Sequence, residues 1–180
     1  MNKLFAELIE NYDFDVDNAA IYYLFDRDTK SNTDESFIMD MVSVLVNARD
    51  NAGYFRQGML LLSYPSVESF TVSNFEAQSF SSAFATGQEI KQYAFQKNYN
   101  HQRISEETLT FAAGEIFAAL RQIEQKSFDI DSFGATSRMV FELEEGEYER
   151  YGLYRVLSLL VIVLIDLGLI EVEENPTDIP

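Results

Sequence analysis

Apolar residues recur at helical spacing over much of the chain. Residues 1–12 carry one apolar stripe with Glu7 and Glu10 turned away from it, which predicts a short amphipathic helix. Ser105 stands where an N-cap residue would accept a backbone hydrogen bond, ahead of a long apolar stripe. The spacing predicts three further helices, near 37–48, 88–99 and 105–124.

Two shorter segments are also assigned to helices. The acidic run 13–17 ends the first helix and offers caps for a second one that carries the apolar residues of 21–25. The run 59–62 would extend a helix until Pro65 forces a turn. The serine-rich segment 63–87 shows neither a helical nor a strand period, so its structure is left open.

The longest apolar run covers 156–170 and predicts the centre of the core. A membrane span needs about 20 apolar residues, whereas this run is shorter and its far flank is acidic. We therefore expect no membrane segment, but a central core helix over about 150–167 that is apolar on all sides. Gly168 would cap this helix. Only three positions interrupt the run: Ser158, Asp166 and Gly168.

Apolar residues occupy every second position in part of the segment near 138–150. Met139, Phe141 and Leu143 are separated by single residues, and Glu145-Gly146 fits a tight turn, so the segment predicts a small β hairpin.

The predicted fold class is mainly α. It is a compact helical domain around the central apolar helix, about 150–167, and the helix 105–124, with the small β hairpin near 138–150. No proline-rich or glycine/serine-rich linker divides the chain and no segment recurs, so residues 1–180 are expected to form a single globular domain.

The strong negative charge of the chain limits the partners that it can bind. Thirty Asp and Glu face 13 Lys and Arg, which leaves a formal net charge of −17 over 180 residues. This argues against direct binding of nucleic acid, which depends on cationic side chains. Glu7 and Glu10 interrupt the start of the chain too early for a signal peptide. The expected location is cytoplasmic.

The sequence lacks the residues and motifs of most classes of enzyme. The chain has no cysteine, which excludes thiolate nucleophiles and cysteine-based metal sites. His101 is the only histidine and lies in a polar segment. The eight glycines are isolated from one another, so the sequence contains neither of the glycine-rich motifs that bind phosphate. We expect no enzymatic activity and no cofactor. A glycosidase stays open, because it needs only two carboxylates.

The sequence does not predict a metal site built from carboxylates. Three segments resemble the opening of a calcium loop, but each lacks the glutamate required at the twelfth position. We read them as caps and turns, with weak divalent-cation binding as the alternative. The three are Asp13-x-Asp15-x-Asp17, Asp26-x-Asp28 and Asp129-x-Asp131.

The densest charge lies in residues 142–149, with five carboxylates in eight residues. In the predicted hairpin, like charges would face each other and destabilise it by roughly 0.2–1 kcal/mol a pair. Such a face either meets a cationic partner or forms a solvated turn. The candidate partner-binding residues are Glu142, Glu144, Glu145, Glu147 and Glu149, with Asp13, Asp15 and Asp17.

Binding is the function that this pattern favours. We expect a non-catalytic acidic binding protein that occupies a basic surface of a partner protein, as an inhibitor, an immunity protein or a nucleic-acid mimic would. The alternative is a structural or assembly subunit, such as a virion component or an acidic chaperone, with the aromatic-rich segment 64–99 as its interface. A homo-oligomer stays open. The salt dependence of binding distinguishes the two functions. Salt screens exposed charge pairs, so binding through an acidic surface should weaken steeply with salt, whereas an assembly interface should be little affected.

Overall fold

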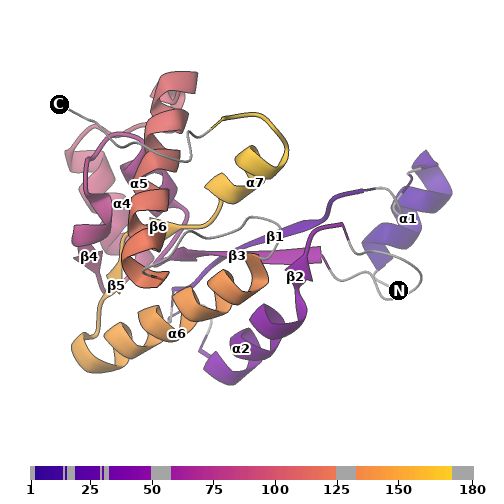
Figure 1. The fold of residues 1–180 in the computed structure, drawn as a ribbon, viewed down its shortest axis with the longest axis horizontal. Coiled ribbons are helices and arrows are strands. Elements are labelled where there is room, and N and C mark those ends of the chain that lie inside the picture. Colours follow the sequence, from indigo (N-terminus) through magenta and orange to yellow (C-terminus); the bar gives the residue numbers. More distant parts are fainter. Residues whose placement is uncertain are drawn as a thin grey trace.

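The computed structural model describes residues 3–13, 15, 19–28, 30, 33–49, 58–124 and 133–171. Helices cover both faces of a mixed sheet (Figure 1). The helices are α1 (Lys3–Tyr12), α2 (Glu35–Val44), α3 (Glu68–Ser73), α4 (Gly87–Gln96), α5 (Glu106–Glu124), α6 (Phe133–Tyr151) and α7 (Val161–Asp166), with the 3-10 turns η1 (Ser79–Ser81) and η2 (His101–Arg103). The strands are β1 (Tyr22–Asp26), β2 (Val46–Asn47), β3 (Gly58–Tyr64), β4 (Ala83–Phe84), β5 (Tyr154–Arg155) and β6 (Leu157–Ser158).

Strand β3 is the centre of the sheet. Strand β1 runs parallel to it along its length, from Tyr22 opposite Met59 to Asp26 opposite Ser63. Two short antiparallel strands share the other edge: β2 pairs with the start of β3, and β6 pairs with its end. All seven residues of β3 are buried, as expected for a strand covered on both faces.

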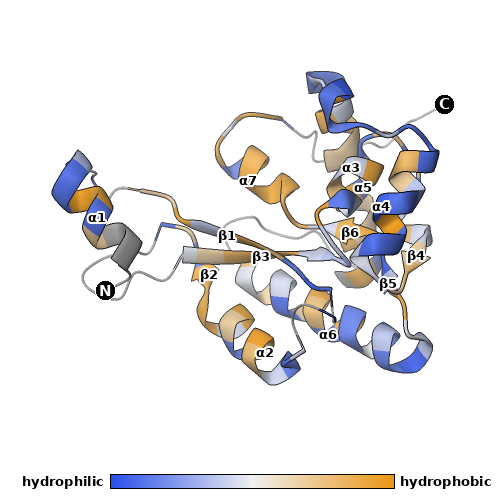
Figure 2. Ribbon diagram, turned by 180° about the vertical axis from the view of Figure 1, so that it is seen from behind, coloured by the Kyte–Doolittle hydropathy of each residue, from blue (hydrophilic) through white to orange (hydrophobic). Residues whose placement is uncertain are grey.

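The helices form two layers around the sheet. Helices α2 and α6 lie on one side, and α3, α5 and α7 lie on the other (Figures 1 and 2). Helix α4 packs against α3. Helix α1 stands apart at one end of the long axis, where Leu8 packs near Ile21 and Tyr23.

The main core joins both layers to β3. It contains buried residues of every layer, among them Val42, Leu60, Leu61, Leu62, Ile116, Leu120, Phe141, Leu157 and Val161. A second, smaller core lies between α3 and α4 and contains Val72, Ile90, Ala94 and Val156. Burial on this scale contributes about 25 cal/mol per Å² of apolar surface removed from water.

The prediction of a mainly α fold is wrong. The chain forms a mixed α/β structure whose central element is a buried strand. The run 59–62 belongs to β3, and the residues 22–25 belong to β1 rather than to a helix. A short apolar run fits a buried strand as well as a buried helix, and only its pairing partners decide between them.

The central apolar helix over 150–167 is also absent. This segment leaves α6 at Tyr151, forms β5 and β6, and becomes helical only in the six residues of α7. The strand β6 is fixed to β3 by its backbone and by the contact between the Ser63 and Ser158 hydroxyls at 2.7 Å. The apolar composition therefore reports the burial of most of residues 156–162 but not their conformation, and Leu167 and Leu169 are exposed.

The hairpin near 138–150 is replaced by the continuous 19-residue helix α6. Its buried side repeats at helical spacing, but four of its members are polar: Thr136, Ser137, Glu144 and Glu145. Figure 2 accordingly shows α6 in largely hydrophilic colours although it covers the sheet. These polar residues hid the helical stripe and left the alternation as the visible pattern.

Four of the helices expected from the sequence are confirmed within a few residues: α1, α2, α4 and α5. The Ser105 hydroxyl accepts the Thr108 N–H at 3.4 Å, as predicted for the cap of α5. Helix α2 is capped by Asp34, whose carboxylate accepts the Phe37 N–H at 3.0 Å. Gly168 follows α7 with a φ of +66° and closes the helix end as expected.

Within the described ranges, none of the helices is both long and apolar enough to cross a membrane.

Candidate functional site

Helix α6 distributes the five glutamates of 142–149 over different environments. Glu142 and Glu149 are exposed and Glu147 is half-buried, whereas Glu144 and Glu145 are buried. The single acidic face of the predicted hairpin therefore does not form, because a helix turns successive residues by about 100°.

Glu145 forms a buried ion pair with Arg27, directly after β1. Arg27 donates from Nε to Glu145 Oε1 at 2.7 Å and from Nη2 to Oε2 at 2.6 Å. Both side chains are under a tenth exposed. Burial raises the pKa of the Glu145 carboxyl, and the hydrogen bonds from Arg27 oppose that shift. A bidentate Arg–carboxylate pair fixes geometry as well as charge, so it locks α6 to the end of β1.

Aromatic rings enclose this ion pair. The Tyr154 hydroxyl donates to Glu145 Oε1 at 3.0 Å, and the Arg27 guanidinium lies 5.8 Å from the Phe141 ring centre. The Tyr148 and Tyr154 rings stack at 4.5 Å. Because Arg27, Phe141 and Tyr154 are fully buried, we assign the cluster to structure rather than to ligand contact.

Glu144 is fully buried without a cationic partner of its own. Its Oε2 accepts the backbone N–H of Arg155 at 2.9 Å, and Oε1 has no hydrogen-bond partner within the described part of the chain. The Arg155 guanidinium pairs with Glu147 at 3.2 Å instead. Burial raises the pKa of the Glu144 carboxyl to about 8. Glu144 is therefore held largely as the neutral acid at neutral pH.

Further exposed carboxylates lie on or next to α2 and on α6, two helices that pack against each other. We call this surface the acidic α2–α6 face. Arg138 and Glu142 form an exposed pair there at 2.9 Å. Exposed Phe37 and Met139 lie on the same two helices. The exposed charged residues of the face are Asp34, Glu35, Asp40, Glu142 and Glu149, against Arg138 and Arg150.

The N-terminal acidic candidates lie elsewhere. Asp13 and Asp15 are exposed beyond the end of α1, and Asp17 lies outside the described residues. Figure 1 places α1 at one end of the molecule, away from the C-terminal half of α6. The structure therefore does not combine Asp13 and Asp15 with the glutamates of α6. Across the described part of the chain, no three His, Cys, Asp or Glu side chains are grouped so as to hold a metal ion.

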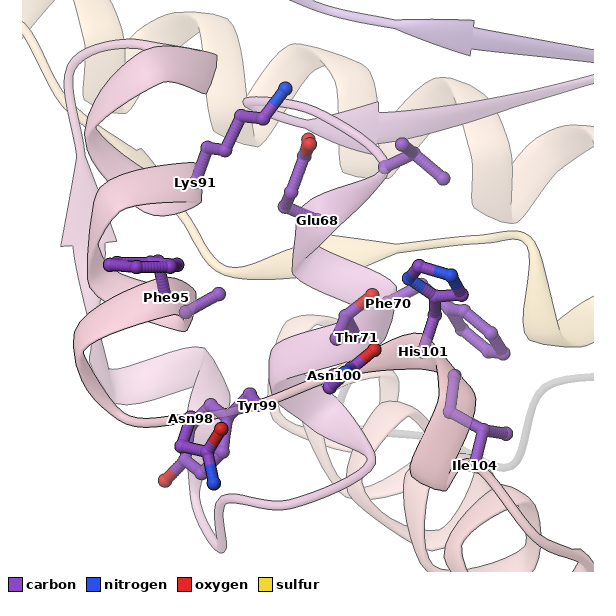
Figure 3. A pocket seen from close by; sticks show the side chains of 12 residues that line it. Glu68, Phe70, Thr71, Lys91, Phe95, Asn98, Tyr99, Asn100, His101 and Ile104 are labelled. Carbon is purple, nitrogen blue, oxygen red and sulfur yellow. The ribbon is translucent and has the colours of Figure 1, made fainter.

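A hollow of about 710 Å³ opens between α3, α4 and the segment through η2 (Figure 3). We call it the α3–α4 hollow. Val67, Phe70 and Ile104 supply apolar wall, and Lys91 and Glu68 lie at one end of it. Exposed His101 lines another side. The volume falls within the roughly 300–1,000 Å³ of ligand pockets.

Sequence reasoning missed this hollow and the exposed aromatic residue beside it. Phe95 lies on α4 at the rim and is 85% exposed. The other aromatic residues of 64–99 are buried or half-buried, so the aromatic-rich segment contributes to both cores. One feature of the sequence could have indicated Phe95. It follows the buried Ala94 directly and therefore lies on the polar side of α4, outside the helix's apolar stripe.

No family model matches the chain, and neither the curated proteins nor the solved structures include a significant match.

Proposed function

We propose that this protein is a non-catalytic binding protein whose acidic α2–α6 face occupies a basic surface of a partner protein. The carrying observation is the excess of exposed carboxylates on two packed helices, with Phe37 and Met139 exposed among them. Carboxylates would steer a cationic partner to this face. The exposed apolar side chains would supply the desolvated contacts that dominate binding energy.

Helix α6 offers this face on a rigid support. The buried Arg27–Glu145 pair holds the helix against β1, so the exposed carboxylates keep a fixed spacing. Little conformational entropy would then be lost on binding. An inhibitor or an immunity protein that blocks a basic site would use such a preorganised surface, and a cytoplasmic location is part of this proposal.

The carboxylates of α6 are too sparse to imitate the phosphates of DNA closely. Their density suits a partner whose surface is basic without being shaped to bind DNA. Residues 142–149 span about 10 Å along α6 at 1.5 Å per residue, and only two of their carboxylates are fully exposed. B-DNA would present about six charges over that length, at one per 1.7 Å.

Two variants of equal net charge test the proposal. Asp40→Lys/Glu149→Lys changes the face, whereas Glu106→Lys/Glu171→Lys makes the same charge change at exposed positions elsewhere. Immobilised proteins would capture partners from a lysate at about 50 mM and about 300 mM salt, between which exposed pairs become strongly screened. We expect basic proteins that the parent and the second variant retain at low salt and the first variant loses. Equal capture by both variants, or capture insensitive to salt, contradicts the proposal.

An assembly subunit is the second candidate function, and one observation favours it. Phe95 is 85% exposed beside the α3–α4 hollow, and exposed aromatic residues are enriched at subunit interfaces. This role predicts a defined oligomer.

A further inference from the structure

The α3–α4 hollow is bordered by the most basic segment of this acidic chain. Between Glu89 and Glu106 there is no Asp or Glu, while Lys91, Lys97 and Arg103 supply three of the 13 basic residues. Lys91 lines the hollow. The Lys97 ammonium lies over the Tyr93 ring at 5.5 Å. The segment is thus basic, while the hollow itself is lined by one lysine, Lys91, and one glutamate, Glu68.

The walls of the hollow call for an apolar occupant. Val67, Phe70 and Ile104 contribute apolar surface, and the rim residue Phe95 is exposed to water. Glu68 is the acidic group of the lining and accepts the Ser66 hydroxyl at 2.8 Å, at the end that Lys91 shares (Figure 3). A fitting occupant is therefore amphipathic, with an apolar stripe and acidic flanks.

Helix α1 has these properties and is only partly covered. Leu8 is turned towards Ile21 and Tyr23, whereas Ile9 is 37% and Tyr12 is 76% exposed. Glu7 and Glu10 are exposed on the same helix. Its ten residues form a rod of about 15 Å.

The positions of the two elements exclude contact within one molecule. Figure 1 shows α1 at one end of the long axis, and α4 lies at the other. An α1 helix can therefore reach an α3–α4 hollow only in another copy of the chain.

We infer that α1 of one copy binds in the α3–α4 hollow of a second copy, with Ile9 and Tyr12 against the apolar wall and Phe95. Glu10, about 100° around the helix from Ile9, then faces the basic segment of 91–103, while Glu7 lies on the side turned away from the apolar wall. Such a contact is heterologous, so repetition gives a ring or a filament. At physiological salt, repulsion between the two acidic molecules is screened beyond about 8 Å, while the close pairs persist. The inference rests on the assembly role proposed above and is independent of the acidic α2–α6 face.

Sedimentation equilibrium over a range of concentrations tests this contact. We expect the mean mass of the full chain to rise with concentration, and Phe95→Ala to weaken association at least tenfold. Phe111→Ala, which removes an exposed phenylalanine ring from α5, serves as the matched control and leaves association unchanged. Circular dichroism confirms that each variant is folded.

Charge exchange identifies the occupant. Lys91→Glu/Lys97→Glu and Glu10→Lys should each be monomeric, because either change places like charges in the contact. An equimolar mixture should associate again, because each altered element then meets an opposite charge. A mixture that stays monomeric overturns the inference.

Two other results would distinguish a wrong α1 contact from a wrong assembly role. A parent chain that is monomeric at every concentration overturns both the contact and the assembly role. A parent oligomer that Phe95→Ala and both charge variants leave intact overturns the α1 contact alone, since the copies then associate through another surface.

Discussion

Arg27 and Glu145 are 118 residues apart in sequence, and their side chains form two parallel hydrogen bonds inside the protein. The pair joins the end of β1 to the middle of α6. It also determines which part of the acidic segment stays available to solvent, because it turns Glu142 and Glu149 outward.

Breaking this pair should be costly. Arg27→Ala leaves a buried carboxylate without its partner, which destabilises proteins by about 3–5 kcal/mol. Urea unfolding of the variant measures this loss. Replacing both residues together, as Arg27→Met/Glu145→Leu, should restore much of the stability, since no unpaired charge remains. A similar loss in the single and double variants would show that packing, not charge pairing, determines the effect.

The exposed pair on the same helix is the natural comparison. Arg138 and Glu142 are each more than half exposed, so Arg138→Ala should change the free energy of unfolding by only about 0.5 kcal/mol. A loss as large as that of Arg27→Ala would contradict the assignment of the two environments.

Glu144 should make stability depend on pH. Its carboxyl has a pKa of about 8 in the folded protein, against an ordinary value of 4.5. Between these values the folded state binds one proton more than the unfolded chain, so the free energy of unfolding falls as pH rises, by up to about 1.4 kcal/mol per pH unit. The contribution is complete below pH 4.5 and lost by about pH 8. Urea unfolding across this range measures the slope.

The neutral variant Glu144→Gln should flatten this dependence and gain most, relative to the parent, at the alkaline end. Glu142→Gln removes an exposed carboxylate from the same helix and is the matched control, expected to keep the parental slope. Equal slopes in the parent and in Glu144→Gln would show that Glu144 ionises normally in the folded protein.

Two glycines should respond in opposite directions to alanine. Gly146 lies inside α6 with open space around its Cα, so Gly146→Ala should stabilise the protein by roughly 0.5–1 kcal/mol. Gly168 also has open space but a φ of +66°, so Gly168→Ala should destabilise it by about 1–2 kcal/mol. Thermal unfolding of both variants checks the signs. Destabilisation by Gly146→Ala would instead favour a tight turn at 145–146.

The sequence predicted those helices whose buried stripe is apolar throughout. Helix α5 is the clearest case, because Ser105 marks its start and its apolar positions continue for several turns. Helix α6 was missed because buried polar groups occupy part of its stripe. The strand β3 was missed because an apolar run states only that a segment is buried.

The site residues were harder to predict than the helices. A glutamate in an acidic segment normally belongs to the surface, and nothing near 145 reveals that Arg27 will lie opposite it. That information is contained only in the tertiary arrangement, which brings β1 and α6 together. For the same reason, Phe95 became a candidate only when its exposure was known.

The division of the β3 edge between β2 and β6 has a consequence for the order of folding. Ser63 and Tyr64 pair with residues 157–158, almost a hundred positions later, so a growing chain leaves this part of the edge unpaired until those residues are made. Open apolar edges recruit other chains, and such distant pairing slows folding. We expect a chain ending at residue 152 to scatter light during refolding under conditions in which the full chain remains clear.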